Sequence, residues 1–68
     1  MSLSDRMLTI ISDHRTWITR RMIAERLTDG RYIYLTPSRI VALSNLVRDG
    51  RIEARKPGLA WEYRKVKK

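Results

Sequence analysis

Residue types that often stabilise small proteins or carry their chemistry are scarce in this chain of 68 residues. Cysteine is absent, which excludes disulfides and thiolate metal sites. There is a single histidine, His14, so a zinc site built from clustered histidine and cysteine is excluded as well. The three glycines do not form a glycine-rich phosphate loop.

Groups that converge for catalysis are also missing. His14 falls on the apolar side of the predicted first helix, where it is expected to pack at the edge of the core. No two carboxylates are spaced as an obvious acid–base pair. We therefore expect a protein that is not an enzyme, with no catalytic residues, no metal and no cofactor. No small-molecule ligand is evident either.

Long hydrophobic runs are absent, and none approaches the ~18 residues of a membrane span. The N-terminus lacks the basic-then-apolar pattern of a signal peptide. We expect no membrane partner and a cytoplasmic or nucleoid-associated location. The length fits one domain, residues 1–68, with a small core.

Basic residues outnumber acidic ones, and the basic excess is distributed unevenly along the chain. Fifteen Lys and Arg oppose seven Asp and Glu, for a formal net charge of +8. Residues 1–19 sum to zero, whereas residues 20–48 (six basic, two acidic) and residues 49–68 (seven basic, three acidic) each carry +4. Such asymmetry favours a face that meets a polyanion.

Three helices are predicted from apolar spacing and capping residues. The first covers residues 4–13, capped by Ser2 or Ser4. The second covers residues 20–27, after a short strand within 16–19 and a cap at Thr19. Residues 28–35, "TDGRYIYL", form a turn that continues as an extended piece or an ordered loop. The apolar side of the first helix holds Leu3, Met7, Ile10, Ile11 and His14.

The third helix is predicted over residues 37–49 within "LTPSRIVALSNLVRDGRI". Thr36 is its N-cap, Pro37 suits the first helical position, and Gly50 ends it in the left-handed conformation. Its buried sector is expected to hold Ile40, Leu43, Leu46 and Val47. The opposite sector holds Ser38, Val41, Ala42, Asn45 and Arg48, with Val41 half-buried against the hairpin that follows.

A β-hairpin is predicted over residues 52–66. Pro57 and Gly58 suit the middle of a type II turn. Arg55 and Lys56 form a basic tip, with no acid between Arg55 and Trp61. Core packing is a better interpretation of Trp17, Trp61 and Tyr63 than base stacking, because these residues fall at strand positions in a small domain.

The chain resembles the winged helix-turn-helix family over nearly its whole length. "TRRMIAERL" is similar to the second helix of that family, "LTPSRIVALSNLVRDGRI" to its recognition helix, and "RIEARKPGLAWEYRKV" to its wing. The resemblance implies an α+β fold of three helices, a short strand and a C-terminal β-hairpin wing. One departure is clear: residues 28–35 replace a turn of about three residues.

The resemblance further implies a small, sequence-specific protein that binds double-stranded DNA and regulates transcription, of a phage or prokaryotic kind. The third helix (about 37–49) would enter the major groove, and the wing (about 52–66) would follow the backbone or an adjacent groove. A homodimer fits this interpretation. Two alternatives stay open: a protein-interaction module within a larger complex, and a non-specific nucleic-acid-binding protein.

Particular side chains suit particular DNA contacts. Arg39 can pair with guanine and Asn45 with adenine, whereas Thr36 and Ser38 at a helix N-terminus suit a phosphate. The resemblance implies that the start of the second helix lies over the DNA backbone, and the longer turn would add a contact loop carrying Arg31, Tyr32 and Tyr34. The predicted DNA-binding residues are Arg20, Arg21, Arg31, Thr36, Ser38, Arg39, Ala42, Asn45, Arg48, Arg55 and Lys56. Arg64, Lys65, Lys67 and Lys68 would add diffuse attraction.

Overall fold

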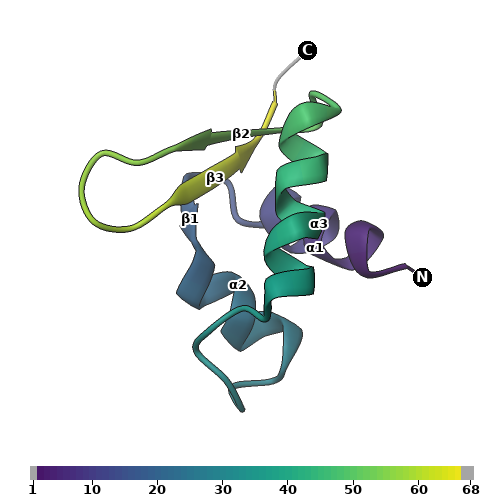
Figure 1. The fold of residues 1–68 in the computed structure, drawn as a ribbon, viewed down its shortest axis with the longest axis vertical. Coiled ribbons are helices and arrows are strands. Elements are labelled where there is room, and N and C mark those ends of the chain that lie inside the picture. Colours follow the sequence, from purple (N-terminus) through teal and green to yellow (C-terminus); the bar gives the residue numbers. More distant parts are fainter. Residues whose placement is uncertain (1, 67–68) are drawn as a thin grey trace.

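A computed structural model describes residues 2–66, which form three helices and a three-stranded antiparallel sheet (Figure 1). This is the α+β class expected from the sequence. The elements in chain order are α1 (Leu3–Asp13), β1 (Ile18–Thr19), α2 (Arg20–Leu27), α3 (Pro37–Arg48), β2 (Ile52–Arg55) and β3 (Glu62–Lys65).

Side-chain caps set the beginning of each helix. Ser2, rather than Ser4, caps α1: its hydroxyl accepts from the backbone N–H of Asp5 at 3.2 Å, so the helix begins at Leu3. Thr19 caps α2 and Thr36 caps α3, with Pro37 at the first position of α3, as predicted.

Gly50 sets the end of α3. Gly50 has a φ of +75°, a left-handed backbone conformation that glycine adopts at little cost in free energy. The N–H of Gly50 donates to the carbonyl of Val47 at 3.0 Å, and the N–H of Arg51 donates to that of Leu46 at 3.0 Å. These two hydrogen bonds satisfy carbonyl groups that the end of the helix would otherwise leave unpaired, and they turn the chain towards β2.

The core receives side chains from all six elements. The largest fully buried side chains are Met7, Ile11, Ile18, Ile23, Leu43 and Ile52. Tyr63 is also buried, and it stands opposite Ile18 of β1 and Ala54 of β2 in the sheet, whose strand order is β1-β3-β2. The short strand predicted within residues 16–19 is thus an edge of this sheet.

The predicted hairpin is confirmed, but its predicted turn is wrong. Positive φ occurs among the described glycines at Gly30 and Gly50 and not at Gly58, which excludes a type II turn centred on Pro57 and Gly58. Residues 56–61 instead form a wider loop between β2 and β3. With six residues between the strands, the chain reverses without a left-handed residue.

The nine residues between α2 and α3 form an ordered loop without a strand. Asp29 (φ 53°) and Gly30 (φ 85°) end α2, with the N–H of Gly30 donating to the carbonyl of Glu25 at 2.7 Å. The Thr28 hydroxyl accepts from the N–H of Tyr32 at 3.0 Å and donates to the carbonyl of Ala24 at 2.8 Å. The hydrogen bonds of Thr28 fix the first end of the loop, and the packing of Leu35 against the core fixes the other end.

Candidate nucleic-acid interface

Arg20, the first residue of α2, is held between the helices and the sheet. Its Nε donates to the Tyr63 hydroxyl at 2.8 Å. Its Cζ lies 5.6 Å from the ring centroid of Trp61 and 5.9 Å from that of Tyr63, within cation–π range. Because Thr19 pairs with Glu62 in the sheet, the pairing of β1 with β3 brings Arg20 to the hairpin.

Two shallow hollows meet at Arg20. The smaller, about 200 Å³, lies between α3 and the hairpin and includes Ser44 and Trp61. The larger, about 340 Å³, lies between the start of α2 and the loop before α3, and includes Arg21 and Tyr34. Among the described residues, no acidic side chain lines either hollow.

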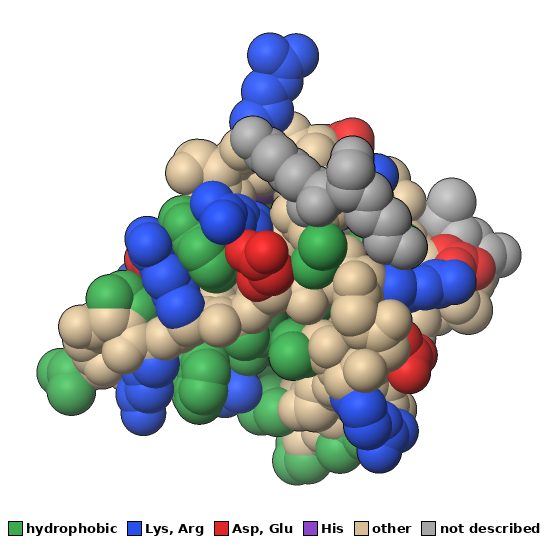
Figure 2. All heavy atoms as spheres, turned by 90° about the horizontal axis from the view of Figure 1, so that it is seen from above, with side chains coloured by type: hydrophobic (Ala, Val, Ile, Leu, Met, Phe, Trp, Pro, Cys, Tyr) green, Lys and Arg blue, Asp and Glu red, His purple; other side chains and the backbone are tan. Residues whose placement is uncertain are grey.

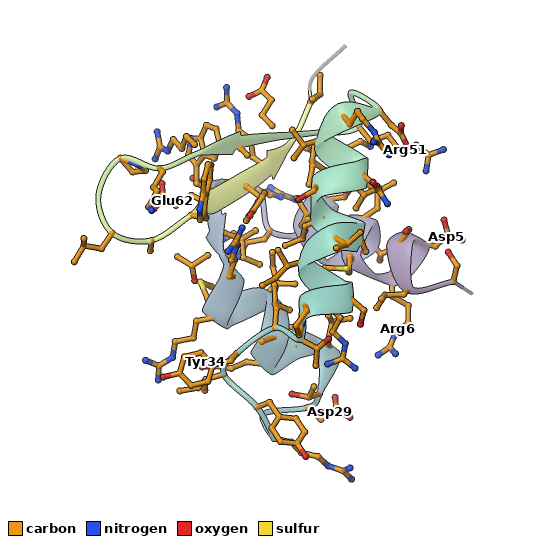
Figure 3. All side chains as sticks on the ribbon, viewed as in Figure 1. Asp5, Arg6, Asp29, Tyr34, Arg51 and Glu62 are labelled. Carbon is orange, nitrogen blue, oxygen red and sulfur yellow. The ribbon has the colours of Figure 1, made fainter. Side chains whose placement is uncertain are left out.

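These contacts define a surface that we call the Arg20 strip: Tyr34, Arg21, Arg20, Trp61 and Lys56. Lys56 completes it at the hairpin end, where its Nζ lies 5.7 Å from the centroid of Trp61. Figure 3 shows Tyr34 at the other end, beside α2. Aromatic rings and cations thus share one surface next to α3, around hollows that no described acidic side chain lines, although Arg21 also pairs with the exposed Glu25. This combination is suited to a sugar–phosphate chain.

The exposed face of α3 carries no acid between Thr36 and Arg48. Val41, Ser44 and Arg48 are exposed on it, opposite the buried Leu43 and Leu46. Val41 was predicted to be half-buried against the hairpin and is instead exposed. The outward surface of α3 is therefore short-chained and basic at its C-terminal end.

The predicted division of α3 into two sectors is partly wrong. Ala42, predicted to face outward, packs against the core. Ile40, predicted to be buried, is only half-buried and lines the larger hollow. The buried sector is centred on Leu43 and Leu46, which moves Ala42 to its edge. Arg39 lies on the same side, four residues before Leu43, and is half-buried.

Several polar side chains that were predicted to contact DNA form hydrogen bonds within the protein. Arg48 Nη2 donates to Asn45 Oδ1 at 2.8 Å, so these two residues act as a pair. The Thr36 hydroxyl accepts from the N–H of Arg39 at 3.4 Å and lies 3.2 Å from the Ser38 hydroxyl oxygen. The first turn of α3 therefore already uses the Thr36 hydroxyl as a cap.

Arg55 is not at the hairpin tip. It is the last residue of β2, where its Nε lies 2.7 Å from Glu62 Oε1 and its Cζ lies 4.1 Å from the centroid of Trp17. Arg64 covers the same ring, at 4.5 Å, while pairing with Glu53 at 2.7 Å. The charge of Arg55 is thus neutralised, and Lys56 is the tip residue with an exposed charge.

The outer face of the sheet contrasts with α3. Figure 2 looks at the end of the molecule that carries the hairpin and shows acidic side chains among basic ones. The Arg55–Glu62 and Arg64–Glu53 pairs lie on this face. Arg55 and Arg64 on this face are therefore paired with acid, whereas no described acidic side chain lines the two hollows beside α3.

The three aromatic residues expected in the core have different positions. Tyr63 is buried, as predicted. Trp17 is half-buried on the outer sheet face, below Arg55 and Arg64. Trp61 is 37% exposed, so its assignment to the core is wrong. It precedes β3, in the hairpin loop, where the sheet no longer fixes its direction.

Several other predicted residues lie apart from the Arg20 strip or have other partners. Arg31 is exposed in the loop before α3. Arg21 pairs with Glu25 at 3.1 Å, in an exposed pair of the kind that contributes little. Lys67 and Lys68 lie outside the described residues. Trp61 and Ser44 were not predicted as site residues, because their position beside Arg20 depends on the β1–β3 pairing.

Within residues 2–66, no group of three His, Cys, Asp or Glu side chains is placed to hold a metal ion. In the same range no helix is long and apolar enough to cross a membrane. His14 is half-buried at the end of α1, with Nδ1 lying 3.3 Å from Arg26 Nη2.

No protein-family model, curated protein or solved structure matches this chain. What the molecule does has therefore to be inferred from the contacts, exposed faces and charges of its own residues.

Proposed function

We propose that this chain is a winged helix-turn-helix domain that binds double-stranded DNA and discriminates between sequences. The order of elements supports this: helix, short strand, two helices, then a hairpin that pairs with the short strand. In such a domain the β2–β3 hairpin is the wing and α3 is the recognition helix.

The single observation that carries the proposal is the position of Arg20. One arginine joins the start of α2, the exposed side of α3 and the hairpin, in two hollows that no described acidic side chain lines. A duplex laid against α3 meets positive charge on α2 and on the hairpin in the same approach. Phosphates on both sides of a groove can then be neutralised while a helix occupies the groove.

Groove entry by α3 is sterically reasonable. A helix with its side chains is about 10–12 Å across, and the major groove is about 12 Å wide. The outward side chains of α3 are Val41, Ser44 and Arg48, which are short or flexible.

Base reading is assigned to this outward face. Arg48, oriented by Asn45, is the donor for guanine, and Val41 meets a thymine methyl group. The sequence predicts Arg39 as the residue that pairs with guanine. Its half-buried position on the core side of α3 suits a backbone phosphate near the helix N-terminus better.

Selection from random duplexes at about 150 mM salt tests sequence-specific binding. We expect enrichment of one short motif whose core spans about half a helical turn to one turn of DNA. Recovery of bound duplexes without any enriched motif would contradict sequence reading and support the non-specific alternative.

One observation favours a protein-interaction module as the second candidate. Leu59 at the hairpin tip is completely exposed, at 101% of its reference area, and Figure 2 shows hydrophobic spheres projecting at that end. Exposed apolar surface marks a protein contact where it forms a contiguous patch, and Leu59 would belong to such a patch in this candidate. This candidate predicts weak duplex binding at about 150 mM salt and a partner whose capture depends on Leu59.

A further inference from the structure

The loop between α2 and α3 presents large apolar side chains to solvent. Tyr32 is 64% exposed and Tyr34 is 79% exposed, with Ile33 between them. Their backbone is nonetheless fixed, by the Thr28 hydroxyl at one end and by the packing of Leu35 at the other. A fixed loop loses little conformational freedom on binding, so exposed rings on it are well placed to contact a partner.

Only one of the two tyrosines belongs to the Arg20 strip. Tyr34 lines the larger hollow with Arg20 and Arg21, and Tyr32 does not. Figure 3 shows Tyr34 and Asp29 on opposite sides of the loop, so the loop carboxylate is turned away from Tyr34. The surroundings of Tyr34 are thus basic, and charge complementarity favours an anionic partner.

The loop also lies at a different end of α3 from the hairpin. Figure 1 shows it at the lower end of α3, whereas the hairpin projects beside the upper part. Arg20 lines both hollows, so Tyr34 and Trp61 flank it on one continuous surface. A duplex that rests on the hairpin and α3 therefore continues towards Tyr34.

We infer that this loop, together with the start of α2, is an additional contact for the sugar–phosphate backbone, through Tyr34 and Arg21, beyond the contacts of α3 and the hairpin. The inference rests on the proposed function. The Tyr34 hydroxyl donates to a phosphate oxygen, and its ring packs on the adjoining deoxyribose. Arg21 leaves its exposed ion pair with Glu25 and forms an ion pair with the next phosphate, which carries a full charge.

A duplex of about two helical turns with the binding motif at its centre tests the inference, alongside versions shortened on one side or the other. For wild-type protein, shortening one side is expected to lower affinity about tenfold, the effect of losing one hydrogen bond to a charged oxygen. Tyr34→Ala is expected to lose about tenfold on the full duplex and nothing more on that shortened one.

Tyr32→Ala is the matched control, because Tyr32 is also exposed on the loop but lies outside the hollow. It is expected to bind as wild type. Tyr34→Phe, which keeps the ring, is expected to retain part of the affinity. Equal thermal unfolding of the three variants and wild type shows that the fold is intact, as expected for exposed side chains.

The outcomes separate the two proposals. Absence of wild-type binding to the full duplex overturns both the proposed function and the loop contact. Normal wild-type binding with unchanged affinity in Tyr34→Ala overturns the loop contact alone, and is the result expected if the loop binds a protein instead. Equal losses in Tyr32→Ala and Tyr34→Ala also overturn it, because only Tyr34 faces Arg20.

Discussion

In the proposed complex with DNA, individual residues divide into those that would read bases and those that would hold the backbone. Arg48 lies on the exposed face of α3 and is oriented by Asn45, whereas Lys56 lies at the hairpin tip beside Trp61. A base contact discriminates between sequences, and a phosphate contact does not. The two side chains therefore differ in the expected effect of their removal.

Arg48→Ala is expected to weaken binding to the selected motif by about 1–3 kcal/mol and to leave random duplex binding nearly unchanged. Lys56→Ala is expected to weaken both alike and to reduce the salt slope by about one. Titrations of each variant against both duplexes measure this. Equal losses on both duplexes in both variants would refute the division.

The Tyr63 hydroxyl positions Arg20 through a bond of 2.8 Å. Tyr63→Phe keeps the buried ring but leaves Arg20 without this partner. The free energy of unfolding is expected to fall by about 1 kcal/mol, and affinity for all duplexes is expected to fall with it. Denaturant unfolding and duplex titration provide the two values. A loss of stability with unchanged affinity would show that the bond serves the fold alone.

At the scale of elements, Gly50, which precedes β2, and Gly58, which lies in the loop between β2 and β3, differ in backbone conformation. Gly50 has φ +75° at the end of α3, whereas Gly58 has no positive φ, and both face open space. Gly50→Ala is expected to destabilise by about 1–2 kcal/mol, because an L-residue is strained there. Gly58→Ala is expected to be neutral or stabilising by up to about 1 kcal/mol.

Thermal or denaturant unfolding of Gly50→Ala and Gly58→Ala compares the two sites directly. Similar destabilisation by both would mean that the hairpin loop needs a glycine as much as the helix end does. That result would contradict the wide, unstrained loop of residues 56–61.

Helix ends were predictable from the sequence because their causes are local. Thr19, Thr36 and Gly50 each cap through groups within a few residues. Which side of α3 is buried was less predictable, because the burial of Ile40 and Ala42 depends on how the helix packs against the rest of the core. The exposure of Trp61 and its contact with Arg20 depend on the pairing of β1 with β3, which brings Arg20 to Tyr63, 43 positions later in the chain. No local pattern indicates them.

Across the whole molecule, charge is sorted between faces. The outer sheet face carries two cross-strand ion pairs, Arg55–Glu62 and Arg64–Glu53. The exposed face of α3 and the Arg20 strip carry arginine and lysine with no described acid lining the hollows. Arg20 and Lys56, which have no cross-strand acidic partner among the described residues, therefore lie beside α3, and such local positive charge is what the proposed duplex binding requires.

The dependence of duplex affinity on salt tests this account most directly. If about five phosphates are neutralised, a plot of log affinity against log salt concentration is expected to have a slope of about −4.5. Titrations of the wild-type chain with duplex DNA between about 50 and 300 mM salt cover the necessary range. A slope near zero, or no duplex binding at the lowest salt, would contradict the claim that this surface binds DNA.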